Sequence, residues 1–189
     1  HLGTEMALQA TPYKISLDIS DTDRGVYESV KFTVARHPSE TELRLATRVL
    51  AYAMFYHPQL AFGRGLSDSD EAALWEMDLT GEIQHWIDVG LPDAARVIKA
   101  SRRAPRMSVV VYGNARLWRE KVLPQFAHLT NVNVFVLPQN ELAEIASKLQ
   151  RSTHWGVMIS DGQLYISDDV EQMTVAFECL HGEMPEFHL

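Results

Sequence analysis

The sequence lacks the cysteines, the long apolar segments and the signal peptide that are typical of exported or membrane proteins. Cys179 is the only cysteine, so the chain can form neither an internal disulfide nor a thiolate zinc site. The longest nearly apolar run, 49–56, is far shorter than the roughly 20 residues that a membrane helix requires. Residues 1–5 are polar and precede the first methionine, which indicates a cloning remnant and no secretory signal. We therefore expect a soluble, cytoplasmic protein that hydrophobic burial stabilises.

Positive charge is also in short supply, because 17 lysines and arginines face 25 acidic residues and give a net charge of −8. Broad coating of a nucleic acid depends on many lysine and arginine contacts to phosphate, so this composition argues against it. A local basic patch stays compatible with the sequence. The excess of carboxylates fits either a divalent-metal site or a solvated acidic surface.

Hydrophobic periodicity predicts a single domain of mixed α/β class over residues 6–189. A chain of 189 residues with 46% hydrophobic content can bury one core. Strands and helices alternate in the second half, which favours parallel pairing with right-handed crossovers. The predicted elements are strands 13–19 and 30–34, a helix from about 40 to 56, a hairpin within 72–89, a helix opened by Pro92 and Asp93, a strand at 107–112, a helix at 115–122, a strand at 132–137, a helix at 139–150, and two or three strands within 155–177.

Several catalytic signatures are missing. The chain has no G-x-x-x-x-G-K-[ST] phosphate loop, no H-E-x-x-H and no G-x-S-x-G. Gly63-Arg64-Gly65 lacks the third glycine of a dinucleotide fingerprint, so no organic cofactor is expected. The eight histidines are scattered without the spacing of metal ligands, which favours core or surface roles for them.

Acidic residues do gather around the second hairpin. Magnesium prefers oxygen ligands, and a phosphodiester nuclease needs little more than carboxylates to hold the metal and a lysine to stabilise charge. Asp88 is the favoured ligand because it ends a strand face shared with Trp86, just before Gly90 takes the chain out of the sheet. An acid at a strand end with no ligand is the alternative. The acids of this group are Asp68, Asp70, Glu71, Asp78, Glu82 and Asp88.

Three segments resemble the YaeQ proteins in the same order, namely 35–41 (ARHPSET), 63–66 (GRGL) and 86–92 (WIDVGLP). The resemblance extends from about residue 6 into the C-terminal strands. It implies a compact mixed fold related to the PD-(D/E)XK nucleases, whose core runs α-β-β-β-α-β. Their site is one acid followed by an acid-x-lysine element on the next strand.

The resemblance also implies roles for single residues. Asp88 would be the acid of the acid-x-lysine element, and Asp70 or Glu71 the earlier acid. Together these three would bind Mg²⁺ or Mn²⁺. Glu42 would match a catalytic acid that some relatives place on the first core helix. A capping box with Ser39, three residues earlier, explains Glu42 equally well.

One departure from the pattern concerns the lysine. The position two after Asp88 is Gly90, which supplies no charge. Related folds can offer the lysine from the following helix, and Lys99 is then the candidate catalytic cation. A solvated surface lysine is the alternative.

A basic stripe is predicted on that same helix. Arg96, Lys99 and Arg103 recur at intervals of three and four residues, and Arg102 and Arg106 extend them. Such a stripe can bind a phosphate backbone or can be an ordinary solvated helix face. Two hypotheses follow: a metal-dependent phosphodiester hydrolase that uses Asp88, Lys99 and Glu42, or a non-catalytic module that binds nucleic acid or protein.

Overall fold

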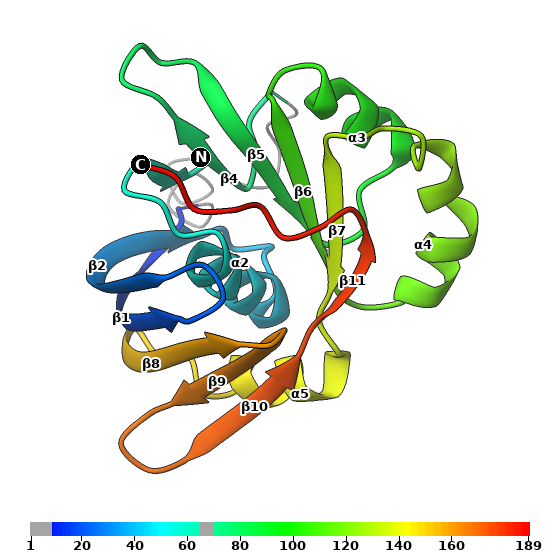
Figure 1. Cartoon of the computed structure of the whole chain (residues 1–189). Coiled ribbons are helices and arrows are strands. Elements are labelled where there is room, and N and C mark those ends of the chain that lie inside the picture. The colour runs from blue at the N-terminus through cyan, green and yellow to red at the C-terminus, as the bar shows by residue number, and fades with distance from the viewer. Residues whose placement is uncertain (1–8, 65–69) are drawn as a thin grey trace, which may run out of the picture.

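The computed structural model describes residues 9–64 and 70–189, which form two mixed β-sheets with helices between and outside them (Figure 1). A mixed α and β architecture is therefore confirmed. Within these residues, no helix is long and apolar enough to cross a membrane.

Sheet A is built around the first predicted hairpin. It contains β1 (Thr11–Asp21), β2 (Val26–Arg36), β8 (Ser152–Ser160), β9 (Gln163–Ser167) and β10 (Gln172–Ala176). Their order is β10-β9-β8-β1-β2. Tyr13, Ile15, Leu17 and Ile19 of β1 are buried, and Lys14 and Asp18 between them are exposed, as the alternation predicts. The strand pairs antiparallel with β2, which confirms the hairpin, and parallel with β8 from a distant part of the chain.

Sheet B carries the second hairpin and the predicted crossovers. It contains β3 (Leu60–Phe62), β4 (Leu74–Met77), β5 (Ile83–Val89), β6 (Arg106–Val111), β7 (Val132–Val136) and β11 (Glu178–His181). Their order is β11-β7-β6-β5-β4-β3. The strands β5, β6 and β7 are parallel, and α3 (Ala94–Ser101) and α4 (Ala115–Lys121) connect them. The expected strand, helix, strand alternation is confirmed.

Two cores lie on opposite faces of sheet B. On the inner face, which carries Ile87 and Phe135, the helix α2 (Glu42–Met54) and the buried side of sheet A form the larger core. The helix α5 (Gln139–Ala146) adds to that core. On the outer face, which carries Trp86 and Met107, α3 and α4 form the smaller core. Side chains that alternate along β5 therefore point into different cores.

The start of α2 differs from its predicted capping box. Thr41, not Ser39, is the N-cap, and its hydroxyl accepts a hydrogen bond from the backbone nitrogen of Arg44 at 3.1 Å. The hydroxyl of Ser39 instead pairs with Nδ1 of His37 at 2.7 Å. The predicted capping role of Ser39 is therefore wrong, because a nearer ring nitrogen engages its side chain. Glu42 is the first residue of the helix and is exposed.

This difference gives a simple test. Replacing Thr41 with alanine should lower the free energy of unfolding by about 1 kcal/mol, because one helical N–H loses its side-chain acceptor. Replacing Ser39 with alanine should change it by less than about 0.5 kcal/mol. Urea denaturation followed by circular dichroism measures both, and equal losses in the two variants would contradict the assignment of the cap.

Candidate functional site

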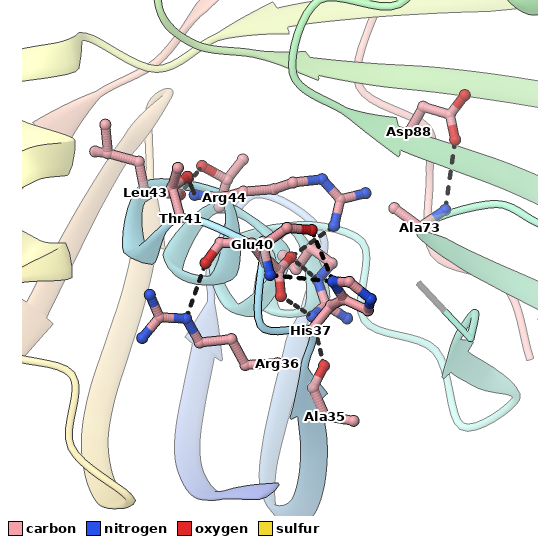
Figure 2. Close-up of polar contacts among 12 residues, drawn as sticks. Ala35, Arg36, His37, Glu40, Thr41, Leu43, Arg44, Ala73 and Asp88 are labelled. Atoms are coloured by element: carbon pink, nitrogen blue, oxygen red, sulfur yellow. Dashed lines mark hydrogen bonds and ion pairs between the residues drawn. The ribbon is translucent and has the colours of Figure 1, made fainter. Parts of the chain in front are cut away.

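Asp88 lies near the end of β5 on the outer face of sheet B, next to Trp86 on the same face. The residue is only 3% exposed. Its Oδ1 accepts a hydrogen bond from the indole nitrogen of Trp86 at 3.1 Å. The same oxygen accepts one from the backbone nitrogen of Ala73 at 3.4 Å, as Figure 2 shows. The carboxylate is thus buried and hydrogen-bonded, and its negative charge requires a partner.

Arg96 provides that partner. It lies in the first turn of α3, where the N-cap residue Asp93 accepts a hydrogen bond from its backbone nitrogen at 2.8 Å. Its Nε donates to Oδ2 of Asp88 at 2.7 Å, and its Nη2 donates to Oδ1 at 3.1 Å. Two-point pairing of a guanidinium with a carboxylate is both strong and directional. Both oxygens of Asp88 are therefore occupied by donors of the chain itself.

Further contacts hold the Arg96 side chain in place. Its Nη2 also donates to the backbone oxygen of Glu71 at 2.8 Å. Its guanidinium carbon lies 5.8 Å from the ring centre of Trp86, and that of Arg103 lies 5.0 Å from the same ring. Cations over an aromatic face are attracted by its negative charge density. Trp86 thus connects the salt bridge to the basic residues at the end of α3.

The other two predicted metal ligands lie nearby but point to other cations. Asp70 meets the Lys99 ammonium at 3.4 Å, and the two side chains are 73% and 62% exposed. The Glu71 carboxylate lies 2.7 Å from Nε of Arg64. Within the described residues, each of the three acids has a different cation as its ion-pair partner. The pairs are Asp70 with Lys99, Glu71 with Arg64, and Asp88 with Arg96.

The remaining predicted residues take other positions. Glu42 begins α2, which packs on the inner face of sheet B, whereas Asp88 points to the outer face. Among the described residues, no hydrogen bond or ion pair joins Glu42 to Asp88. Asp78 accepts bonds from Thr80 and Glu82 in the turn between β4 and β5, and the side-chain bond from Thr80 is the main cause that lowers the pKa of Asp78. Asp68 lies outside the described residues.

A buried acid that the sequence did not indicate lies beside α2. Glu40, which is labelled in Figure 2, is 3% exposed. Its carboxylate binds Arg48 through two hydrogen bonds of 2.6 and 2.9 Å. Arg44 adds a third bond at 2.6 Å. This network anchors the loop before α2 to the helix, because Arg48 also donates to the backbone oxygen of Ala35 at 2.8 Å. We assign it a structural role.

Comparison with known proteins places these features in a family. The family model "YaeQ protein" matches residues 6–177. This chain belongs to the YaeQ family. The YaeQ protein of Escherichia coli K12 is 33% identical over 172 residues, which cover 90% of this chain and 95% of that protein. The YaeQ protein of Salmonella typhi is 34% identical over 165 residues, which cover 86% of this chain and 91% of that protein.

Solved structures of YaeQ proteins have the same fold. The crystal structure of YaeQ from Pseudomonas syringae is 51% identical and superimposes with a TM-score of 0.90, covering 93% of this chain and 98% of that one. The YaeQ structure from Xanthomonas axonopodis pv. citri is 37% identical with a TM-score of 0.89, covering 92% and 99%. The YaeQ relatives from E. coli and S. typhi are each called an uncharacterized protein, so family membership brings no activity with it.

Proposed function

We propose that this YaeQ chain is a non-catalytic nucleic-acid-binding module on a fold related to the PD-(D/E)XK nucleases. The observation that carries the proposal is the two-point salt bridge between Asp88 and Arg96. It engages the carboxylate that a nuclease would use to bind a metal. Gly90, in the position of the missing lysine, agrees with lost chemistry.

The element order supports the relation to nucleases. From α2 onward the chain runs α2, β3, β4, β5, α3 and β6, which is helix, three strands, helix and strand. That is the order of the core that the resemblance implies. Asp88 lies on the third of these strands and Asp70 precedes the second, at the places where that core carries its acids. Order alone is an argument from fold, so the function rests on the site.

The acids within the described residues do not fit a divalent metal. Within residues 9–64 and 70–189, no three side chains of histidine, cysteine, aspartate or glutamate are grouped closely enough to hold an ion. The Asp88 carboxylate already has a cation in the Arg96 guanidinium. A metal would have to displace that pair from a buried place, with a large cost for the separated charges. No catalytic step is therefore assigned to Asp88, Lys99 or Glu42.

The end of α3 offers a surface for phosphate. Arg102 and Arg103 are exposed and line an open cavity of about 660 Å³ together with Glu82 and Gln84 of the neighbouring hairpin. Lys99 lies one helical turn before Arg103 on the exposed side. Arginines bind phosphate oxygens, and an amide side chain such as Gln84 can contact a base or a sugar. The expected ligand is a short stretch of nucleic acid, because the rest of the chain is acidic.

Binding to a labelled oligonucleotide tests this proposal by fluorescence anisotropy at several salt concentrations. For duplex DNA, Arg102→Gln should weaken binding and reduce the slope of log K against log salt by about 0.9, the loss of one phosphate contact. Arg116→Gln, on the exposed side of α4, is the matched control and should bind like the parent protein. Equal binding by Arg102→Gln and Arg116→Gln would contradict the assignment of Arg102 to the binding surface. Absence of binding to single-stranded and double-stranded DNA and RNA would contradict the proposed function.

The metal-dependent hydrolase is the second candidate, and one observation favours it. Asp70, Glu71 and Asp88 all pair with cations on or beside α3, and Lys99 is one of those cations. A cleavage screen with DNA and RNA in Mg²⁺ and Mn²⁺ decides between the two functions. We expect no cleavage and no difference in metal binding between the parent protein and Asp88→Asn by calorimetry. Cleavage that Asp88→Asn or Lys99→Met abolishes would establish the hydrolase and refute the module.

A further inference from the structure

The inner face of sheet B holds a row of buried polar residues that the proposed function does not use. Glu76 of β4, His85 of β5, Ser108 of β6 and Asn133 of β7 are all 8% exposed or less. They come from four neighbouring strands. In each strand, a residue next to the polar one in the sequence points to the outer core instead. A hydrogen bond of 2.7 Å joins Nε2 of His85 to the hydroxyl of Ser108. Buried polar groups in such a row are costly unless they have partners.

The C-terminal segment 183–189 covers this row. It leaves β11, crosses in front of β7 and β6, and ends near β4 (Figure 1). The backbone nitrogen of Glu183 donates to Oδ1 of Asn133 at 3.1 Å. The ring nitrogen Nε2 of His57 lies 2.8 Å from the backbone oxygen of His188, and its ring lies 5.9 Å from that of Phe187. Met184 and Phe187 of the segment also pack against the larger core.

The two larger cavities at the segment are both lined by Arg106. One has a volume of about 740 Å³ and is also lined by Asn133, Glu183 and Glu186. The other has a volume of about 500 Å³ and is also lined by Glu76 and His57. His188 lines both cavities. Volumes in this range are typical of sites for small molecules.

Arg106 itself has a donor without a partner. Its Nε is the one buried side-chain nitrogen or oxygen that lacks a hydrogen bond within the described residues. Its Nη2 lies 3.8 Å from Glu76, which is too long for a hydrogen bond. A buried donor that bonds to nothing costs about 1–3 kcal/mol, so an acceptor at this place would be favourable. A carboxylate is the acceptor that matches a guanidinium best.

The charges around Arg106 restrict the ligand further. The covering segment brings Glu183 and Glu186 to the cavity of about 740 Å³, and Glu76 lies 3.8 Å from Arg106. A simple anion on Arg106 would therefore meet three negative charges beside one positive charge. A molecule with a carboxylate at one end and an ammonium group at the other satisfies both sides. We propose that this cavity binds a free α-amino acid, with its carboxylate on Arg106 and its ammonium group near Glu183 and Glu186.

The test is a thermal-shift screen of the free α-amino acids, followed by calorimetry on the best binder. At least one should stabilise the protein saturably at millimolar concentration. The N-acetyl derivative and the methyl ester of that amino acid each lack one charge and should bind at least about tenfold more weakly. The proposal fails if no amino acid binds, which would leave water as the partner of Arg106, or if the derivatives bind as well as the parent compound.

Variants locate the site. Arg106→Met should weaken binding of the amino acid at least about tenfold, whereas Arg116→Met, which removes an exposed arginine outside both cavities, should leave it unchanged. Glu186→Gln changes an exposed residue of the covering segment and serves if Arg106→Met does not fold. It should weaken binding of the amino acid but should not further weaken binding of the N-acetyl derivative, which carries no ammonium group. Unchanged amino-acid binding in Arg106→Met, or in Glu186→Gln where Arg106→Met does not fold, would overturn the proposal.

Discussion

Replacing Arg96 with methionine is expected to lower the free energy of unfolding by about 3 kcal/mol, because it leaves the Asp88 carboxylate buried without its counter-charge. Asp88 is 3% exposed, and both of its oxygens accept hydrogen bonds from Arg96. Methionine keeps most of the packing of the side-chain stem, so the loss reports mainly on the charge. Urea denaturation followed by tryptophan fluorescence measures it.

Two further variants separate this effect from general damage to α3. Lys99→Met removes an exposed cation from the same helix and should cost less than about 0.5 kcal/mol, since its pair with Asp70 is solvated. Combining Arg96→Met with Asp88→Leu should recover part of the loss, because the unpaired buried charge is gone. Equal effects of Arg96→Met and Lys99→Met, or strict additivity in the double variant, would show that the Asp88 carboxylate does not depend on Arg96.

Local patterns predicted much of this fold. The hairpin of β1 and β2 follows from period-two alternation, and the turn between β8 and β9 follows from Asp161 and Gly162, both of which adopt positive φ. The crossovers through α3 and α4 follow from the order of apolar strands and amphipathic helices. In each case, the signal lies within a few residues of the element that it specifies.

Non-local pairing escaped prediction. The parallel alignment of β1 with β8 joins segments more than a hundred residues apart, and neither strand carries a mark of its partner. The short edge strands β3 and β11 have too few residues for a recognisable period. The helix α5 ends at Ala146, four residues before its predicted end, although apolar residues continue to Leu149. Leu149 is buried although it lies beyond the end of the helix.

In the candidate site, too, the local pattern was predicted and the non-local contact was not. Strand alternation correctly places Asp88 and Trp86 on one face, but it does not say which cation reaches them. Arg96 appeared in the sequence as one member of a basic stripe, and only the packing of α3 against β5 turns it toward Asp88. Its position three residues after the N-cap is the available signal, because the first turn of a crossover helix lies close to the end of the preceding strand.

His85 gives the second large effect, which concerns acid stability. Burial is the main cause that lowers the pKa of His85 from 6.5 to about 3, and the positive charges of Arg106 and Arg24 lower it further. The unfolded chain therefore binds a proton at this residue below about pH 6.5 while the folded chain does not. Folding stability from this group is complete above pH 6.5 and is lost as the pH falls toward 3. Between pH 7 and pH 5, the loss should be about 2 kcal/mol.

The matched comparison is between His85→Gln and His128→Gln, because His128 is exposed. Other groups also titrate in this range, so the informative quantity is the change in unfolding free energy from pH 7 to pH 5 in each protein. His85→Gln lowers stability at pH 7 but should lose about 2 kcal/mol less than the parent protein on acidification, since glutamine takes up no proton. His128→Gln should follow the parent curve. If His85→Gln and the parent protein lose the same stability between these pH values, the folded protein must accept a proton at His85, and the inner face of sheet B would then be more polar than its burial indicates.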